Sequence, residues 1–416
     1  MNLAVIGSGI SGCVAAHLLS KEHKVTLYEA SDRIGGHTHT HDINWDGQQF
    51  AIDTGFIVFN ERTYPRFIKL LNRLGVKFEA TEMSFSVKDD ESGLEYNGHS
   101  LNTLFSQRKN LLNISFLKMI IDVLRFNRQA LQAVEQEQTE VSLGEFLQRN
   151  NYSSQFIDNY IIPMGSAIWS TDPATMRAMP AHFFIRFFHN HGLLTVTDQP
   201  QWLVVSGGSK QYIAPLVERF KERIQLGCKV TQLERTANSV TVHTKCGISD
   251  QYDAVFVATH SDQALAMLGQ PSTLEQQVLG NIKYQSNEAI LHTDTSILPS
   301  NRRAWAAWNY HQRGDCSKAV ALTYYMNRLQ NLEAPVDFYV TLNHSEAIDP
   351  NKIIKKISYT HPVYTSQSVA SQARLSEING VNRTYFCGAY WGNGFHEDGV
   401  ASALTAVNLF KQQLYE

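Results

Sequence analysis

Short apolar runs, glycine-rich turns and helical periodicity alternate in three separated stretches of the chain. Residues 1–60 begin with a buried-strand pattern over 3–6, followed by a glycine-rich turn, a helical pattern over 13–21 and a strand pattern over 24–28. Strand patterns recur within 200–283, and residues 376–416 show a strand, a second glycine-rich turn and a final helix. The pattern therefore predicts one α/β domain assembled from residues 1–60, 200–283 and 376–416.

The two stretches between these segments have different periodicities. Residues 61–199 are mainly helical in pattern, with helices expected over 64–74, 111–135 and 142–149, the last with Ser142 as N-cap. Residues 284–375 alternate apolar and polar positions, as in 319–325 and 337–342, which indicates antiparallel strands. Together they predict an interleaved α+β substrate domain, with a ligand in the cleft between the two domains.

Composition favours a two-domain enzyme and excludes some partners. The chain has 416 residues, 43% of them apolar, and a net charge of −3, which gives no electrostatic support for nucleic-acid binding. Its cysteines are odd in number and never spaced as C-x-x-C, so we expect neither a disulfide framework nor a zinc site. With no secretion signal visible at the N-terminus, these features predict a reducing, cytoplasmic location. The cysteines are Cys13, Cys228, Cys246, Cys316 and Cys387.

Two apolar stretches raise the question of membrane contact. Residues 111–126 are shorter than a membrane span and are interrupted by Lys118, Asp122 and Arg125, which indicates a buried or interfacial helix. The aromatic run at 183–188 fits core packing, a lipid tunnel or a membrane surface. We therefore expect a hydrophobic small-molecule substrate and allow for peripheral membrane contact.

The first glycine-rich turn has the pattern of a dinucleotide site. Gly7, Gly9 and Gly12 form G-x-G-x-x-G between a strand and a helix, with Ile10 and Ser11 at the helix start. The glycines allow a tight turn, close approach of the backbone to a pyrophosphate and close packing of helix on strand. Glu29 ends the next strand, where a carboxylate accepts hydrogen bonds from ribose hydroxyls. These residues predict binding of a dinucleotide.

The residues after Glu29 select the cofactor. The run Ala30-Ser31-Asp32-Arg33-Ile34-Gly35-Gly36-His37-Thr38 resembles the flavin amine oxidase superfamily, as do Asp53-Thr54-Gly55-Phe56 and the segments at 163–170, 207–209, 230–246 and 255–259. The resemblance implies a two-domain Rossmann-type fold of the glutathione-reductase kind and FAD as cofactor. The cofactor contacts that it implies beyond the first turn are Ala30, Arg33, Gly35, Gly36, His37, Thr38, Gly55, Phe56, Ile57, Val230, Gly388, Glu397, Asp398 and Val400.

The C-terminal motif at 387–400, CGAYWGNGFHEDGV, resembles a bacterial branch of predicted NAD/FAD-binding proteins associated with fatty-acid modification. That resemblance implies a lipid substrate. The N–H groups at Val400 and Ala401, at the start of the last helix, are expected to stabilise negative charge on a reduced flavin.

Two positions depart from the amine-oxidase pattern. His37 stands where the family usually has arginine, and His396 stands where an aromatic side chain covers the flavin. An imidazole that titrates near neutral pH suits acid–base chemistry better than recognition of an ammonium group. We therefore expect dehydrogenation or desaturation of a lipid-like molecule, with His396 and Tyr390 as catalytic candidates and Trp391 shaping the pocket. A role for His396 in holding the cofactor or capping the helix is equally consistent with the sequence.

Other functions remain open or are disfavoured. An amine oxidase and a redox-neutral flavoprotein, such as an isomerase or hydratase, are the alternatives. His37, His39 and His41 alternate as metal ligands on a strand would, but no fourth ligand is identifiable, so no metal is expected. His260, Ser261 and Asp262 lack the nucleophile elbow of a hydrolase.

Overall fold

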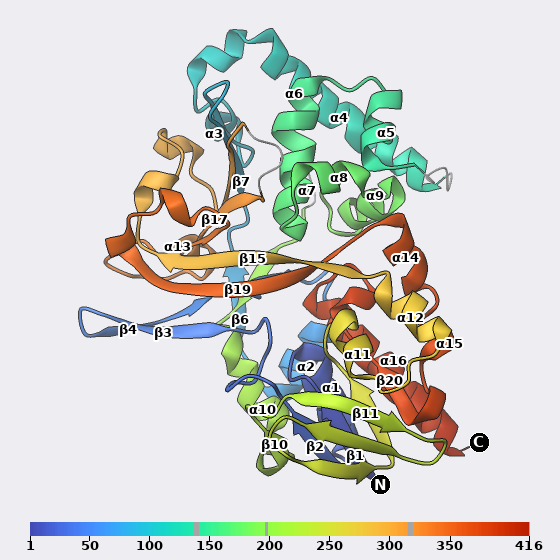
Figure 1. The fold of residues 1–416 in the computed structure, drawn as a ribbon. Helices are drawn as coiled ribbons and strands as arrows, with labels where there is room; N and C mark the ends of the chain where they lie inside the picture. The colour runs from blue at the N-terminus through green and yellow to red at the C-terminus, as the bar shows by residue number, and fades with distance from the viewer. Residues whose placement is uncertain (136–140, 196–198, 315–318, 416) are drawn as a thin grey trace.

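The computed structural model describes residues 1–135, 141–195, 199–314 and 319–415, so Cys316 lies outside the described residues. A five-stranded parallel sheet lies at one end of the molecule in the order β10-β2-β1-β14-β20 (Figure 1). Its strands come from three distant parts of the chain. They are β1 (Asn2–Ile6), β2 (Lys24–Tyr28), β10 (Ile224–Gln225), β14 (Ala254–Val257) and β20 (Thr384–Phe386).

Both faces of this sheet are covered, which is why its central strands are continuous apolar runs. On one face, apolar residues of the sheet pack against four helices, which are α1 (Ile10–Leu19), α2 (Pro65–Leu74), α10 (Ile213–Val217) and α16 (His396–Tyr415). The other face packs against an antiparallel three-stranded sheet and two helices, which are β11 (Val230–Arg235), β12 (Val240–Thr244), β13 (Ser249–Tyr252), α11 (Ser261–Met267) and α12 (Thr273–Gly280). The carboxyl end of β14 leads to His260, which stacks on Tyr284 of β15 (Lys283–His292), so this edge of the sheet faces the rest of the molecule.

A seven-stranded sheet forms the second half of the structure, with only its β16–β7 pair parallel. Its order is β19 (Ile353–Val363), β15 (Lys283–His292), β18 (Tyr339–Leu342), β17 (Ala321–Tyr325), β16 (Trp308–Gln312), β7 (Phe85–Asp89) and β8 (Leu94–Asn97). The long strands β15 and β19 of this sheet run across the middle of the molecule, with β19 at the edge of the sheet (Figure 1). The antiparallel strands expected within 284–375 are confirmed.

The expectation that residues 61–199 are mainly helical needs one correction. They also contain β6 (Phe78–Thr81), β7 and β8. The β7–β8 hairpin turns at Gly93, whose φ of 64° is the left-handed conformation that glycine favours. Each strand has only a few residues and mixes polar with apolar positions, so their period-2 pattern is weak beside the long helical patterns around them.

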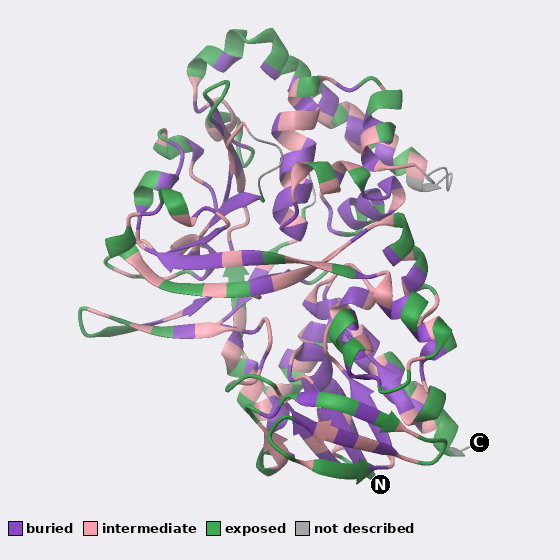
Figure 2. Ribbon diagram, viewed as in Figure 1, coloured by how far each residue is buried: buried purple, intermediate pink, exposed green. Residues whose placement is uncertain are grey.

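The helical layer beside the seven-stranded sheet confirms the strongest helix predictions. The structure has α4 (Ile114–Glu135) and α5 (Leu143–Arg149), and the Ser142 side chain caps α5 by accepting from the Glu145 N–H. In α9 (Ala181–Asn190), the aromatic run lies in the core, because Phe183, Phe184, Phe187 and Phe188 are all buried (Figure 2). A membrane-contact role for that run is therefore wrong.

The remaining elements connect these layers. The strands are β3 (Thr40–Trp45) and β4 (Gln48–Asp53), which form a hairpin, and β5 (Val58–Asn60), which with β6 flanks β9 (Trp202–Val205). The other helices are α3 (Leu101–Leu104), α6 (Ser154–Phe156), α7 (Ile162–Trp169), α8 (Pro173–Ala178), α13 (Met326–Leu329), α14 (Ser366–Gln372) and α15 (Leu375–Ile378).

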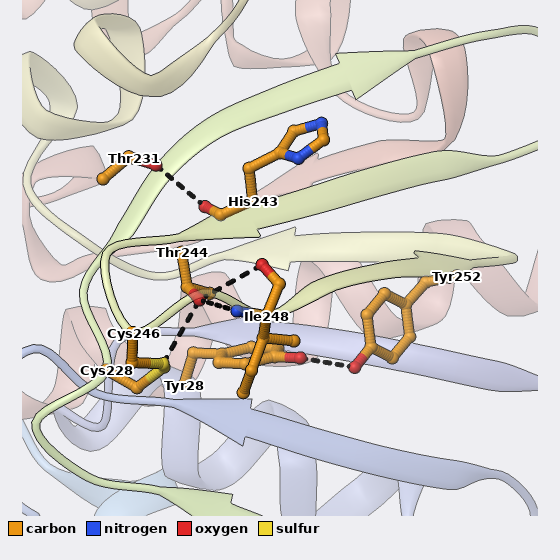
Figure 3. Close-up of a disulfide and its surroundings, with 8 residues drawn as sticks. All are labelled: Tyr28, Cys228, Thr231, His243, Thr244, Cys246, Ile248 and Tyr252. Atoms are coloured by element: carbon orange, nitrogen blue, oxygen red, sulfur yellow. Dashed lines mark hydrogen bonds between the residues drawn. A yellow bond between two sulfur atoms is a disulfide. The ribbon is translucent and has the colours of Figure 1, made fainter.

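The expectation that the cysteines are unpaired is wrong for one pair. Cys228 and Cys246 form a disulfide with their Cα atoms 5.5 Å apart (Figure 3). Val230 of β11 lies opposite Thr244 of β12, so the two cysteines extend this antiparallel pair by two residues on each strand. Spacing rules for metal sites and small disulfide-rich proteins do not capture a pair that strand register brings together.

Candidate functional site

Two glycine-rich turns meet at the carboxyl end of β1. The Gly35 N–H donates to the Ser8 carbonyl oxygen at 3.0 Å, and a Cβ added at Gly36 would lie 3.0 Å from the Gly9 Cα. Gly9 itself faces open space, since a Cβ added there would meet nothing within 4 Å, and no side chain caps α1. The first turn of α1 thus presents its N–H groups to an open cradle of the kind that binds pyrophosphate.

Charged side chains brace this cradle. The Glu29 carboxylate, at the end of β2, accepts from the Ser8 N–H at 2.9 Å and from the Ser31 N–H at 2.9 Å. Ala30 lies between Glu29 and Ser31 in the chain. The Arg33 guanidinium donates to the Gly36 carbonyl oxygen at 2.7 Å and to the Thr38 carbonyl oxygen at 3.2 Å. Both side chains therefore order the glycine turns, and a contact of Glu29 with ribose stays a prediction.

The final helix begins against the first one. A Cβ added at Gly399 would lie 2.6 Å from the Ile10 Cγ2 and 2.9 Å from the Ser11 Oγ, so the first turns of α16 and α1 pack closely. Val400 is buried in the same core. The Gly388 N–H, just after β20, donates to the Ser402 Oγ at 2.9 Å and ties the C-terminal motif to α16. Residues nearly 400 positions apart in sequence thus line one region.

The two acidic residues of the C-terminal motif bind protein N–H groups. The Glu397 carboxylate accepts from the Arg66 and Phe67 N–H groups at 3.1 and 2.9 Å, at the start of α2. The Asp398 carboxylate accepts from the Phe395 N–H at 3.0 Å, and burial raises its pKa to about 6. Both acids cap helix ends, and the structure directs neither at the glycine cradle.

His396 lies in a buried network beside the second glycine turn. Its Nε2 is 3.1 Å from the Thr38 Oγ1 and 3.1 Å from the Tyr212 hydroxyl, and its ring stacks on Phe56 with centroids 3.6 Å apart. Burial lowers the pKa of His396 to about 3. The imidazole is therefore neutral at pH 7, contrary to the expectation that it titrates there.

The D-x-G segment packs directly on the second glycine turn. A Cβ added at Gly55 would lie 2.2 Å from the His37 carbonyl oxygen, which also accepts from the Phe56 N–H at 2.8 Å. Ile57 points the other way, into the apolar core of the seven-stranded sheet. Val230 is buried at the start of β11, two residues after Cys228, whose N–H donates to the Glu29 carbonyl oxygen.

An uncharged cluster of imidazole and phenol rings lies where the carboxyl ends of the parallel strands meet β15 and β19. His37 stacks on Tyr359 at 5.0 Å and lies 5.2 Å from His361, while His260 stacks on Tyr284 at 4.3 Å. Burial lowers the pKa of His361 to about 4 and that of His37 well below its ordinary value. These five side chains are called the His–Tyr cluster below. Ligands of open α/β sheets bind at this edge of the sheet.

Sequence reasoning missed three members of the His–Tyr cluster. Tyr284, Tyr359 and His361 come from strands that pattern alone assigns to a separate sheet. Tyr359 and His361 are two positions apart on β19, so they share one face of the strand, and that spacing was the available signal.

Several buried polar atoms next to the His–Tyr cluster are unsatisfied. Within the described ranges, the His37 Nε2 has no hydrogen-bond partner, and the Tyr390 hydroxyl and the Trp391 Nε1 have none beyond each other. Tyr390 lies against Tyr284 and Trp391, with centroids 6.5 and 4.9 Å apart. An unsatisfied buried polar atom costs about 1–3 kcal/mol, and a ligand rich in hydrogen-bonding atoms would satisfy these groups. Together with the open cradle at Gly9, they fit FAD.

A hollow of about 510 Å³ opens where α2, α9 and the C-terminal motif meet. Phe395 forms part of its wall, and the Phe395 ring also stacks on Phe187 of the aromatic core at 5.2 Å. Its other lining residues are Arg62, Thr63, Tyr64, Pro65, Arg66, His189, Asn190, His191, Asn393, Glu397 and Asp398.

Known proteins resemble the chain along most of its length. It is 22% identical over 311 residues to the flavin-dependent L-tryptophan oxidase RebO of Lentzea aerocolonigenes, covering 68% of this chain and 63% of that one. A putrescine oxidase variant has the same fold, with a TM-score of 0.72, 17% identity and 99% of both chains covered. A fatty acid isomerase from P. acnes that produces CLA has a TM-score of 0.69 at 14% identity, covering 99% of this chain and 98% of that one.

These comparisons confirm the predicted fold class and FAD as the cofactor. The chain spans between 46 and 63% of the length of the curated relatives it matches. The finer resemblance to a branch associated with fatty-acid modification stays a prediction. The family profile described as flavin containing amine oxidoreductase matches residues 10–335, and the chain belongs to that family.

Proposed function

We propose that this protein is an FAD-dependent oxidoreductase that dehydrogenates or desaturates a hydrophobic, lipid-like molecule. The observation that carries the proposal is the His–Tyr cluster. Its imidazoles are neutral, because burial holds the pKa values of His37, His260 and His361 below the ordinary value. The five side chains of the cluster include no carboxylate to pair with an ammonium group, which favours an apolar substrate.

We propose that the parallel sheet belongs to a nucleotide-binding domain assembled from residues 1–60, 200–283 and 376–416, with α2 packed on it from the segment that follows residue 60. The remainder then forms the substrate domain, and the His–Tyr cluster lies at their boundary. FAD supplies the acceptor for two electrons when it is bound. The chain excludes water with its buried rings, and the Tyr390 hydroxyl and the His37 Nε2 are the atoms left to position a ligand.

We assign His396 a positioning role. A neutral imidazole that contacts both Thr38 and Tyr212 fixes the residues after the second glycine turn, and burial makes it a poor proton acceptor at pH 7. Tyr390 is the better catalytic candidate of the two, because its hydroxyl is buried and unsatisfied. The hollow beside Phe395 offers a route from the surface toward the C-terminal motif.

Anaerobic reduction of the bound flavin tests the substrate class. The holoprotein is mixed with an unsaturated or methyl-branched fatty acyl phospholipid, or with a polyamine, while the absorbance of oxidised flavin is followed. Bleaching by the lipid alone supports the proposal, and bleaching by the polyamine alone overturns it in favour of amine oxidation. If neither bleaches the flavin but the lipid product shows a moved double bond or added water, the protein is a redox-neutral isomerase or hydratase.

Two phenol-to-phenyl variants make this test specific. Tyr390→Phe removes a hydroxyl that has no hydrogen-bond partner beyond Trp391 among the described residues, so we expect retained FAD and slower bleaching by at least about tenfold, the loss of roughly one hydrogen bond in the transition state. Tyr28→Phe is the matched control, since the Tyr28 hydroxyl is also buried but bonds to the Tyr252 hydroxyl. Equal rates for Tyr390→Phe and the wild type would remove Tyr390 from the site.

A further inference from the structure

Exposed apolar side chains are concentrated in one segment of the substrate half. Of the twelve large apolar residues that are exposed in the described part of the chain, eight lie between residues 101 and 131. They are Leu101, Leu111, Leu112, Ile114, Leu117, Ile121, Leu124 and Leu131. Soluble monomers rarely expose apolar residues in such a concentration without an interaction partner.

Helix α4 is apolar on two opposite faces. Phe116, Met119 and Phe126 point into the core and are at most 1% exposed. The second face carries five exposed residues with the spacing 3, 4, 3 and 7, which repeats along one side of a helix. These five, Ile114, Leu117, Ile121, Leu124 and Leu131, are called the apolar stripe. Leu111 and Leu112, at 50% and 89% exposure, continue it into the turn before the helix.

Cations predominate around the N-terminal part of the apolar stripe, whereas Glu135 ends α4 four residues after Leu131. Lys109, Lys118 and Arg128 are exposed, and none forms an ion pair within the described residues. Asp122 is the one carboxylate between residues 98 and 134. It is buried and accepts from the Ser153 N–H, so it presents no negative charge outward.

We propose that the apolar stripe docks the protein onto the surface of an anionic lipid bilayer. Leucine and isoleucine insert at the boundary between headgroups and acyl chains, while lysine and arginine pair with anionic headgroups. A second copy of this chain, in a symmetric interface, is the alternative occupant of such an apolar surface, and the oligomeric state distinguishes it from a bilayer. No described helix is long and apolar enough to cross a membrane, so the contact is peripheral.

The stripe lies at the end of the molecule opposite the parallel sheet, on the outer surface of the helical layer (Figures 1 and 2). A bilayer at this position leaves the glycine cradle free. Docking is therefore independent of the proposed chemistry, and each can fail without the other.

Cosedimentation of the FAD-loaded full chain with vesicles tests this proposal. We expect binding to vesicles of phosphatidylcholine mixed with phosphatidylglycerol, weaker binding to phosphatidylcholine alone, and loss of binding at high salt. Ile121→Ser combined with Leu124→Ser should weaken binding by at least about tenfold, because two apolar anchors no longer enter the bilayer. Lys118→Glu should weaken binding to the anionic vesicles by about fivefold or more.

The matched control is Leu226→Ser combined with Val381→Ser, two exposed apolar residues outside the segment 101–131, and it should bind like the wild type. Because all these side chains are exposed, the variants should keep the flavin absorbance and thermal midpoint of the wild type. Equal binding of the stripe variant and the wild type, or no binding to anionic vesicles, overturns the proposal. A concentration-dependent dimer that the stripe variant abolishes, without vesicle binding, would assign the surface to a second copy.

Discussion

Gly9 allows the cofactor role of a glycine to be separated from its structural role. Its φ and ψ of −63° and 177° are extended values that alanine adopts readily, and an added Cβ would meet no protein atom within 4 Å. The substitution Gly9→Ala therefore places one methyl group in the open cradle, where a pyrophosphate would approach the backbone. The protein should accept this methyl group, and the cofactor should not.

The two expected effects differ in size. Alanine restricts the unfolded chain, which stabilises by about 0.4–1 kcal/mol, and it is a poorer N-cap than glycine, which offsets that gain. The net change should stay within about 1 kcal/mol, or about 1–2 °C in Tm for a chain this large. Loss of one hydrogen bond between a backbone N–H and a phosphate costs about 1.5–3 kcal/mol, so the Kd for FAD should rise about 10- to 150-fold.

The assay is a titration of the apoprotein with FAD, followed by flavin fluorescence, alongside thermal unfolding of the apoprotein. Gly98→Ala is the matched control, because its added Cβ also finds room, 4.0 Å from the Phe85 carbonyl oxygen, and lies far from the cradle in sequence. Gly12→Ala is the opposite control, since its Cβ would lie 1.9 Å from the Gly7 carbonyl oxygen and should damage folding itself. If Gly9→Ala binds FAD within twofold of the wild type, the cradle is not the pyrophosphate site.

Three further predictions follow from individual contacts. Cys228→Ser should lower the free energy of unfolding by about 2–4 kcal/mol, because the disulfide closes a loop with a sequence separation of 18. Urea titration should show the same loss for the wild type in dithiothreitol. If the two thiols are unpaired, dithiothreitol should cause no loss. Glu397→Gln should lower the free energy of unfolding by about 1–2 kcal/mol, because it weakens the hydrogen bonds that the Glu397 carboxylate accepts from two N–H groups at the start of α2. An unchanged Kd for FAD would show that Glu397 caps this helix and does not bind the cofactor. Burial lowers the pKa of His292 to about 4, so below pH 6.5 the unfolded chain binds a proton that the folded chain does not. Between pH 6.5 and 4, the free energy of unfolding of the wild type should therefore fall by about 1.4 kcal/mol per pH unit relative to that of His292→Gln. Parallel pH profiles of the two proteins would contradict this.

Local sequence was enough for the nucleotide-binding part of the structure. The β1–α1–β2 unit depends on contacts within about 30 residues. Its glycines mark positions where two backbone segments lie too close together for a side chain. The same holds for α2 and α4, whose 3.6-residue periodicity is a local signal, and for α5, which the Ser142 cap begins. Membership of the flavin-containing family, the fold class and FAD were accordingly accessible from motifs.

Contacts between distant segments were decided only by the tertiary structure. The Cys228–Cys246 disulfide depends on strand register. The hydrogen bond from the Phe67 N–H of α2 to the Glu397 carboxylate of α16 joins residues more than 300 positions apart. The His–Tyr cluster likewise unites the second glycine turn with β15 and β19, and burial, with smaller contributions from neighbouring positive charges, lowers the pKa values of His37 and His361. Periodicity reports which face of an element is buried but not what it is buried against, and the free energies of burial and hydrogen bonding that shape a site depend on that partner.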